Sequence, residues 1–273
     1  MKPALFDHLR PTTVDEAVAL LAEHGDDGKV LSGGQSLVPL LNMRLALPTV
    51  VIDVSRVAEL RGATELPGGG VRYGAGTTHA AFEDRLVPDA TGGLLHHVAA
   101  GIGYRAIRNR GTLGGSLAHA DASAEWPVVM AAVGADVVVR SARGERRIAA
   151  RDLVQGFFTS AVEPDELLVA VEVPALPDGV RWGFHKHARK PGEFAESLAV
   201  ALVGDSSGDV WLGAAREIPV PVALPSLDRD AIQAAVADAL ADLTGEDEGE
   251  VRYRRHLHGV SAWRAVNHAK EHA

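Results

Sequence analysis

The stretch Val30-Leu31-Ser32-Gly33-Gly34-Gln35-Ser36-Leu37 is the point from which the rest of this chain can be interpreted. A short apolar run ends in two glycines, and a polar pair and an apolar segment carrying Pro39 follow. This order predicts a strand, a glycine-rich turn and the start of a helix. A second stretch further along the chain, Ile107-Arg108-Asn109-Arg110-Gly111-Thr112-Leu113-Gly114-Gly115-Ser116, repeats the theme. We expect the two loops to close on one anionic ligand.

Glycine pairs suit phosphate binding because they permit positive φ and a close approach of the backbone to a ligand. Successive N–H groups can then point into one concavity, and a helix that begins there adds partial positive charge. Ser32, Gln35, Ser36, Thr112 and Ser116 add hydroxyl and amide donors without a buried charge. A single Gly-Gly pair is usually only a tight turn, whereas two such loops with similar polar neighbours favour phosphate binding.

Several other readings of these motifs are disfavoured. The chain has no Gly-x-Gly-x-x-Gly between a first strand and a helix, which argues against a dinucleotide-binding Rossmann unit. It also lacks the Gly-x-x-x-x-Gly-Lys-Ser/Thr pattern of a P-loop enzyme. His119 and Asp121 stand near several serines, but no nucleophile elbow accompanies them, so a hydrolase is not favoured.

The composition is that of a globular chain with an acidic balance. The 273 residues are 47% hydrophobic and 23% charged, with a formal net charge of −9. This balance argues against nucleic acid as a partner, which requires a basic face. Without cysteine, the chain has no disulfide and no cysteine-held iron–sulfur cluster of its own. No apolar run is long enough for a membrane span and Met1-Lys2-Pro3 opens no signal peptide, so we expect a cytoplasmic protein.

Local patterns predict a first α+β part over residues 1–54. Thr13-Val14-Asp15-Glu16 fits the capping box of a helix that ends at Gly25. A short helix is predicted at Leu37–Met43, where Pro39 is tolerated in the first turn. Strands are predicted on either side of it, at Lys29–Ser32 and Val50–Asp53.

A second α+β part is predicted over residues 55–175. Gly68-Gly69-Gly70 forms a hairpin tip before a strand at Val71–Ala75, and Thr78 caps a helix that runs to Asp84. The remaining elements predicted in this part are helices at Leu94–Ala100 and Trp126–Ala132 and strands at Ala135–Arg140, Arg146–Ala149 and Leu167–Val173.

The segment Pro174–Gly179, rich in Pro and Gly, predicts a boundary before a C-terminal part over residues 178–273. Strands are predicted there at Arg181–Ala188, Leu198–Val203 and Val210–Ala214, and helices at Asp228–Leu243 and Val251–Lys270, with an acidic linker at Gly245–Glu250 between the helices. We expect a three-stranded sheet with the helices on one face. The predicted fold class of the whole chain is α+β.

The two glycine loops carry a resemblance to a known family. Ser-Gly-Gly-Gln-Ser-Leu at 32–37, followed by Asn42-Met43-Arg44-Leu45, resembles the first flavin motif of the FAD-binding subunit of molybdenum hydroxylases, and residues 107–116 resemble the second. These are enzymes of the xanthine dehydrogenase and carbon monoxide dehydrogenase type, here in the medium-subunit form. The similarity continues at Ala118–Asp121, Glu166–Leu168 and Lys186–Phe194, and ends with the helix over Tyr253–Val266.

The resemblance implies FAD as the cofactor. It implies a two-part FAD-binding domain of the vanillyl-alcohol-oxidase (PCMH) type over residues 1–175 and a C-terminal domain of the carbon monoxide dehydrogenase flavoprotein type over residues 178–273. Glu125 would bond the ribityl or ribose hydroxyls, with Asp121 as a second candidate, and Lys186 would place a cation near the flavin. The full set of implied cofactor-binding residues is Leu31, Ser32, Gly33, Gly34, Gln35, Ser36, Leu37, Thr77, Ile107, Thr112, Gly114, Gly115, Ser116, Asp121, Glu125, Leu168 and Lys186.

By the same resemblance the chain is an electron-transfer subunit. A molybdopterin-containing large subunit would oxidise the substrate, and a small subunit with two [2Fe–2S] clusters would pass the electrons to FAD on this chain. The FAD would then reduce NAD⁺, a quinone or oxygen, and no residue of this chain need act as a catalytic base. Two alternatives stay open: a stand-alone FAD-dependent oxidoreductase that binds its own small substrate, and a non-catalytic nucleotide-binding module.

Two features depart from these patterns. After Val210–Ala214 the chain looks shortened before Asp228, as though a hairpin of the family were reduced, and Phe194-Ala195-Glu196-Ser197 replaces a more apolar continuation.

The twelve histidines include His185-x-His187 on one predicted strand face, but no third ligand is indicated. We therefore predict surface histidines and no metal site.

Overall fold

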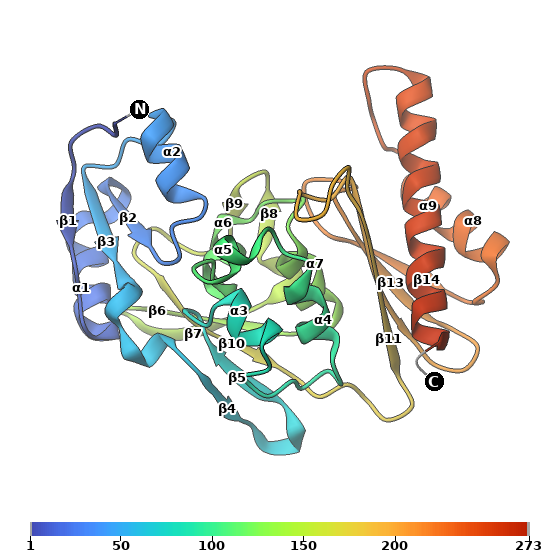
Figure 1. The fold of residues 1–273 in the computed structure, drawn as a ribbon, viewed down its shortest axis with the longest axis horizontal. Helices are drawn as coiled ribbons and strands as arrows, with labels where there is room; N and C mark the ends of the chain where they lie inside the picture. The colour runs from blue at the N-terminus through green and yellow to red at the C-terminus, as the bar shows by residue number, and fades with distance from the viewer. Residues whose placement is uncertain (1, 272–273) are drawn as a thin grey trace.

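The computed structural model describes residues 2–271 and shows three successive α+β parts along the chain (Figure 1). The first part holds a small parallel sheet in the order β1-β3-β2. Its elements are β1 (Asp7–Leu9), α1 (Val14–His24), β2 (Gly28–Leu31), α2 (Leu37–Met43) and β3 (Val50–Asp53). The mixed helix and strand content confirms the predicted α+β class.

Helix α1 begins as its sequence predicts and joins the first part to the second. The hydroxyl of Thr13 accepts a hydrogen bond from the backbone N–H of Glu16, and Gly25 ends the helix with a φ of 51°. Its apolar side is buried in one cluster with Ile52 of β3 and with Val138 and Val169 of the second part. The glycine loop between β2 and α2 is therefore anchored on a packed base.

The second part is built on an antiparallel sheet in the order β4-β5-β10-β6-β7. Its strands are β4 (Ala63–Glu65), β5 (Val71–Gly74), β6 (Asp136–Ser141), β7 (Gly144–Ala149) and β10 (Leu167–Val173), with a small β8–β9 hairpin (Val154–Gly156 and Thr159–Ser160) beside it. Its helices are α3 (His79–Glu83), α4 (Leu94–Ala100), α5 (Arg105–Arg108), α6 (Leu113–His119) and α7 (Glu125–Ala132). Strand β10 comes last in the sequence but lies in the middle of the sheet.

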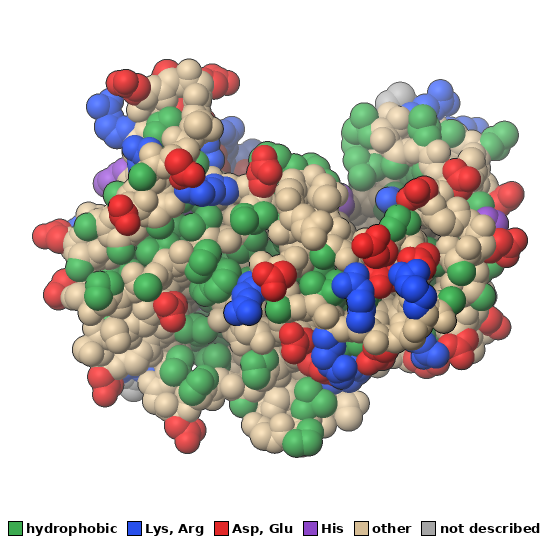
Figure 2. All heavy atoms as spheres, turned by 180° about the vertical axis from the view of Figure 1, so that it is seen from behind, with side chains coloured by type: hydrophobic (Ala, Val, Ile, Leu, Met, Phe, Trp, Pro, Cys, Tyr) green, Lys and Arg blue, Asp and Glu red, His purple; other side chains and the backbone are tan. Residues whose placement is uncertain are grey.

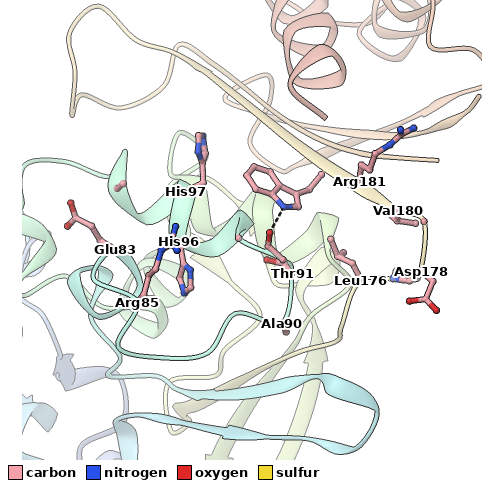
Figure 3. Close-up of a pocket in the computed structure, with 16 residues that line it drawn as sticks. Glu83, Arg85, Ala90, Thr91, His96, His97, Leu176, Asp178, Val180 and Arg181 are labelled. Atoms are coloured by element: carbon pink, nitrogen blue, oxygen red, sulfur yellow. Dashed lines mark hydrogen bonds between the residues drawn. The ribbon is translucent and has the colours of Figure 1, made fainter. Parts of the chain in front are cut away.

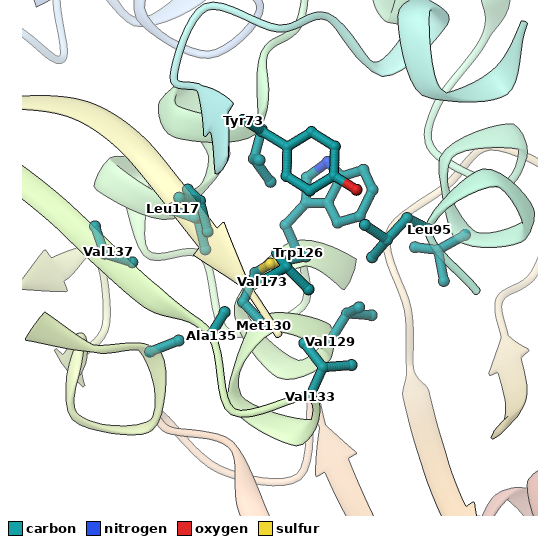
Figure 4. Packing of buried hydrophobic residues seen from close by; sticks show 14 of the residues in the cluster. Tyr73, Leu95, Leu117, Trp126, Val129, Met130, Val133, Ala135, Val137 and Val173 are labelled. Atoms are coloured by element: carbon teal, nitrogen blue, oxygen red, sulfur yellow. The ribbon is translucent and has the colours of Figure 1, made fainter. Parts of the chain in front are cut away.

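The helices of the second part cover this sheet and bury the largest side chains of the chain. Trp126 of α7, Phe82 of α3 and Tyr73 of β5 are fully buried. The ring of Phe82 contacts that of Tyr73 at a centroid distance of 5.0 Å and that of Trp126 at 5.2 Å. Figure 4 shows Tyr73 and Trp126 within this core. Aliphatic side chains such as Met130 and Leu117 fill the space around them. Each buried aromatic ring adds a large apolar area to the core.

The C-terminal sheet has four strands, so the prediction of three was wrong. Its order is β11 (Arg181–His187), β12 (Ser197–Val203), β13 (Gly208–Gly213) and β14 (Val220–Leu224), all antiparallel. Strand β14 was not predicted because Pro221 makes this stretch of sequence resemble a loop. Proline is tolerated there because β14 lies at the edge of the sheet. Val220, Val222 and Leu224 alternate inward, as a half-buried strand requires.

The two faces of the C-terminal sheet contact different cores. Leu198 and Val200 of β12 belong to the same cluster as Trp126 of the second part. Ala199 and Ala201 face α8 (Arg229–Ala239) and α9 (Glu248–Glu271) on the other side. Helix α9 begins at Glu248, so half of the predicted acidic linker is helical. Residues 174–179 connect β10 to β11, and the parts on either side of them share one apolar core. A domain boundary at this segment stays a prediction.

No helix among residues 2–271 is long and apolar enough to cross a bilayer.

Candidate functional site

The first glycine loop, Leu31–Leu37, joins the end of β2 to the start of α2. Gly34 has a φ of 75°, a backbone conformation that is energetically unfavourable for residues with a Cβ. Within residues 2–271 no acceptor is found for the backbone N–H groups of Gly33, Gly34, Gln35 or Ser36. Successive N–H groups without internal partners at a turn form a concavity suited to an anion. The loop therefore offers backbone donors to a diphosphate.

The second glycine loop leads into α6, a helix that the sequence pattern did not reveal because two glycines occupy its first turn. Thr112 caps this helix, and its hydroxyl accepts from the N–H of Gly115 at 3.1 Å. Gly114 lies against Ala75, the residue that follows β5, and its N–H donates to the carbonyl of Ala75 at 2.9 Å. A Cβ at position 114 would come within 2.6 Å of the Ala75 side chain, so glycine is required there.

The two loops lie against each other. The hydroxyls of Ser32 and Thr112 are hydrogen bonded at 3.0 Å across the first and second parts. At Gly33 a Cβ would stand 2.2 Å from the carbonyl oxygen of Arg110, so the backbones approach too closely for any side chain. The glycines of the first loop thus serve two purposes, a positive φ at Gly34 and a close approach at Gly33. The structure brings together the two motifs that the sequence singled out.

His79 supports the second loop, a role that no motif in the sequence indicates. Its Nδ1 accepts a hydrogen bond from Nε1 of Trp126 at 3.0 Å, and its backbone N–H donates to the carbonyl of Gly111 at 2.9 Å. Burial lowers the pKa of His79 to about 4, with a smaller effect from the positive charge of Arg108. The ring is therefore neutral at physiological pH. A Cβ at Gly111 would come within 2.7 Å of Nε2 of His79.

Arg108 and Glu83 hold the segment before the second loop. The guanidinium of Arg108 donates to both carboxylate oxygens of Glu83, at 2.7 and 2.8 Å, and to the carbonyl of Gly103 at 2.9 Å. Hydrogen bonds from Arg108, with a further contribution from Arg105, keep the pKa of Glu83 below its ordinary value. This bidentate pair fixes α5 on α3 and so orients the loop that follows.

Glu125 and Lys186 form an ion pair between the second part and the C-terminal part. Lys186 Nζ of β11 donates to a carboxylate oxygen of Glu125 at the start of α7, at 2.6 Å, and to the carbonyl of Gly101 at 3.3 Å. Side-chain exposure is only 5% for Glu125 and 12% for Lys186. Burial raises the pKa of Glu125, and the Lys186 cation opposes that rise. The resemblance assigned Glu125 to the ribityl or ribose hydroxyls and Lys186 to a position near the flavin, and the structure shows the two side chains in direct contact.

The remaining predicted residues lie at different depths. Thr77 is buried and its hydroxyl donates to the carbonyl of Gly62, while Asp121 accepts from the N–H of Ser123 at 2.8 Å. Leu168 pairs with Val139 inside the central sheet and belongs to the apolar core. Gln35 and Ser116 remain accessible at the two loops, and Ile107 is half-buried in α5. Contact of each with a cofactor stays a prediction.

A separate cavity of about 840 Å³ lies where α4 faces the segment between β10 and β11 (Figure 3). Thr91, His96, Leu176 and Asp178 line it, and Nε1 of Trp182 donates to the carbonyl of Gly92 across one side. None of the predicted cofactor-binding residues lines this cavity. Among residues 2–271 no cluster of three or more His, Asp or Glu side chains could hold a metal ion.

Comparison with known proteins identifies the family. The model of the FAD-binding domain in molybdopterin dehydrogenases matches residues 4–176. The chain belongs to this family. It carries both glycine loops within the matched region, and its cofactor is FAD.

Relatives at higher and lower identity agree with this assignment. The chain is 42% identical, over 74% of its length and 68% of the relative's, to 6-hydroxypseudooxynicotine dehydrogenase complex subunit alpha of Paenarthrobacter nicotinovorans. It is 33% identical to the carbon monoxide dehydrogenase medium chain of Afipia carboxidovorans, over 100% of this chain and 99% of that one. A chain of reconstituted CO dehydrogenase from Oligotropha carboxidovorans superposes with a TM-score of 0.91 at 33% identity, with both chains fully covered. The protein is an FAD-binding oxidoreductase subunit of the molybdenum hydroxylase family.

Proposed function

We propose that this chain is the flavin subunit of a three-subunit molybdenum hydroxylase. A molybdopterin-containing large subunit oxidises the substrate, and a small subunit with [2Fe–2S] clusters transfers the electrons to FAD on this chain. The FAD passes them to NAD⁺, a quinone or oxygen. The absence of cysteine fits this division of labour, because a chain without thiolates has no cluster of its own.

The nest of free N–H groups in the first glycine loop is the observation that carries the proposal. The backbone N–H groups of Gly33, Gly34, Gln35 and Ser36 have no acceptor among the described residues. The hydroxyl of Ser32 is hydrogen bonded to that of Thr112 in the second loop. A diphosphate supplies the acceptor oxygens and the negative charge that such a concavity lacks. The residues present therefore fit FAD, held by its diphosphate between the two loops.

FAD supplies the redox chemistry, and this chain binds and orients it. The loops Leu31–Leu37 and Thr112–Ser116 hold the diphosphate. The buried pair of Glu125 and Lys186 places one acceptor and one cation at the start of α7. We propose that Glu125 accepts from ribityl or ribose hydroxyls and that Lys186 stabilises negative charge on the reduced ring.

The relatives support the assembly but leave the substrate open. One is named a complex subunit and the other a medium chain, as expected of proteins that work in multi-subunit enzymes. Their names specify two unlike substrates, 6-hydroxypseudooxynicotine and carbon monoxide. This difference fits a chain that does not bind the substrate itself.

The direct test is a titration of the flavin-free chain with FAD, FMN, ADP and NAD⁺, followed by flavin fluorescence or heat. We expect tight binding of FAD and weak binding of FMN, because the loops hold the adenine–diphosphate half. Gly33→Ala places a Cβ against the Arg110 carbonyl and separates the loops. We expect it to weaken FAD binding by about 100-fold, or about 3 kcal/mol.

Gly204→Ala is the matched control, because a Cβ there would meet its nearest neighbour at 3.8 Å. It is expected to bind FAD as the wild type does. Equal FAD affinity in Gly33→Ala and the wild type would contradict the proposal that these loops hold the diphosphate. A folded wild-type chain that binds no FAD would favour the non-catalytic module, and turnover of an organic substrate without partner subunits would favour the stand-alone oxidoreductase.

A further inference from the structure

The ion pair of Glu125 and Lys186 lies in an environment unlike that of most charged side chains of the protein. Figure 2 shows acidic and basic side chains spread over one face of the molecule, where solvent screens them. By contrast, the side chain of Glu125 is only 5% exposed and that of Lys186 is 12% exposed. A buried carboxylate and a buried ammonium group stay ionised because each neutralises the other. The pair therefore adds no net charge to its site.

One cation balances one carboxylate here. Among residues 2–271, Lys186 is the one side chain that forms a hydrogen bond with Glu125, with its Nζ donating to Oε1 at 2.6 Å. The other acceptor of Lys186 is the carbonyl of Gly101, a neutral group. Asp121, in the segment between α6 and α7, is the second charged residue that acts on Glu125, and it repels the carboxylate. Lys186 thus has no positive charge to spare for a further anion.

The ionised state of Glu125 depends on this cation. Burial raises the pKa of Glu125, the charge and hydrogen bond of Lys186 oppose the rise, and Asp121 adds a smaller increase. A new anion that competes for Lys186 removes part of the opposing effect. A protonated, neutral Glu125 is then more favourable than a buried carboxylate without full compensation.

We propose that Glu125 is the proton acceptor that balances the charge of flavin reduction in this subunit. This inference rests on the proposed function, in which Lys186 stabilises negative charge on the reduced ring. Uptake of two electrons from the iron–sulfur clusters and one proton from water leaves one extra negative charge beside Lys186. A second proton from water then bonds to a carboxylate oxygen of Glu125. Two electrons and two protons have entered, and the net charge of the site is unchanged.

The other carboxylates nearby lack the features that this role requires. Asp121 is half-buried, accepts from the N–H of Ser123 and has no basic partner whose charge a new anion could divert. Glu196 is paired with Arg189 at 2.6 Å, but the two side chains are 31% and 81% exposed. Water stabilises the charge of an exposed carboxylate, so Glu196 has no need of a proton when its partner is drawn away.

The test measures the midpoint potential of FAD bound to the purified full chain, by potentiometric titration at several pH values from neutral upward. In the wild type we expect a slope that corresponds to about two protons per two electrons. In Glu125→Gln, which keeps the size and an acceptor oxygen but takes up no proton, we expect about one. Glu125→Asp restores a carboxyl group and is expected to return the slope toward the wild-type value.

Infrared difference spectroscopy of the same samples gives a second readout. Reduction of the wild type should produce the carbonyl band of a protonated carboxyl group, and this band should shift when glutamate is labelled with carbon-13. Its absence from the wild type would overturn the proposal even if Glu125→Gln does not retain FAD. Glu196→Gln is the matched control, a carboxylate that is also paired with a basic residue but is exposed. It should keep both the slope and the band.

The remaining outcomes separate this inference from the proposed function. A slope of two protons in Glu125→Gln would assign the second proton to another group and overturn the inference, and so would a slope of one proton in the wild type. If the wild-type chain binds FAD and its slope does not depend on Glu125, only this inference fails. If the folded wild type binds no FAD, the proposed function fails and this inference fails with it.

Discussion

At the scale of single residues, His258 is a neutral histidine enclosed in the C-terminal core. Its Nδ1 lies 2.9 Å from the hydroxyl of Ser197, which in turn donates to Ser261 at 2.9 Å. Its Nε2 has no hydrogen-bond partner among residues 2–271. Burial lowers the pKa of His258 to about 4, and the positive charge of Arg254 adds to the effect. Protonation would place an unpaired N–H in an apolar interior.

Because its pKa is lowered in the folded state, we expect His258 to make the protein less stable in acid. The folded pKa of about 4 lies below the value of about 6.5 in an unfolded chain. Its contribution is complete above pH 6.5 and is lost as the pH falls toward 4, because the unfolded state takes up the proton first. We expect this group to remove up to about 3 kcal/mol over that range.

Urea unfolding at several pH values measures this slope for the wild type and for His258→Gln. Between pH 6.5 and 4, the slope of the free energy of unfolding against pH should be smaller in the variant, by up to the equivalent of one bound proton. His256→Gln, on an exposed position of the same helix, is the control. Identical slopes in the wild type and His258→Gln would contradict the assignment.

At the scale of elements, the contact of β11 with α9 depends on one glycine. A Cβ on Gly183 would stand 1.8 Å from the carbonyl oxygen of Ala265 and 2.8 Å from the N–H nitrogen of Ala269. Both clashes involve the helix backbone, which cannot rotate out of the way as a side chain can. The strand therefore lies closer to the helix than any side chain allows.

Gly183→Ala is expected to destabilise the chain by about 3 kcal/mol, because it overpacks a backbone-to-backbone contact. The free energy of unfolding from urea titration measures the effect. Gly204→Ala, whose Cβ has room, should change stability by less than about 0.5 kcal/mol. A wild-type value for Gly183→Ala would show that α9 shifts easily on the sheet.

At the scale of the whole molecule, the C-terminal part is held to the FAD-binding parts along β11. Trp182 donates to Gly92 at one end of this seam and Lys186 pairs with Glu125 at the other. Leu198 and Val200 of the neighbouring strand β12 join the core of the second part. The seam therefore combines a shared apolar core with a buried ion pair between the second part and the C-terminal part.

Removing one member of the Glu125–Lys186 pair should lower the free energy of unfolding more than removing both. Lys186→Met leaves the buried carboxylate of Glu125 unpaired and is expected to lower stability by about 3 kcal/mol. The double variant Glu125→Gln/Lys186→Met should recover most of that loss. Because burial raises the pKa of Glu125 and Lys186 opposes the rise, the single variant should be most unstable at high pH and recover as the pH falls. Urea titrations at pH 8 and pH 5.5 test the cycle, and additive losses would contradict a direct coupling.

Much of the fold follows from local sequence. Thr13 and Thr78 each accept a hydrogen bond from the third residue of the helix that they cap. The helices Leu37–Met43 and Leu94–Ala100 and the strand Leu167–Val173 have the predicted bounds. Capping, positive φ and the alternation of apolar residues act over a few residues, so a sequence displays them directly.

The two glycine loops are the part of the site that the sequence by itself determined, because tight turns and close approaches admit no other residue. Only the tertiary structure decided that Ser32 meets Thr112, that Lys186 pairs with Glu125 and that Leu168 lies in the core. Strand β14, despite Pro221, is likewise fixed by its place at the edge of the sheet. Such pairings depend on which surfaces the whole chain buries together, and no short stretch of sequence records that choice.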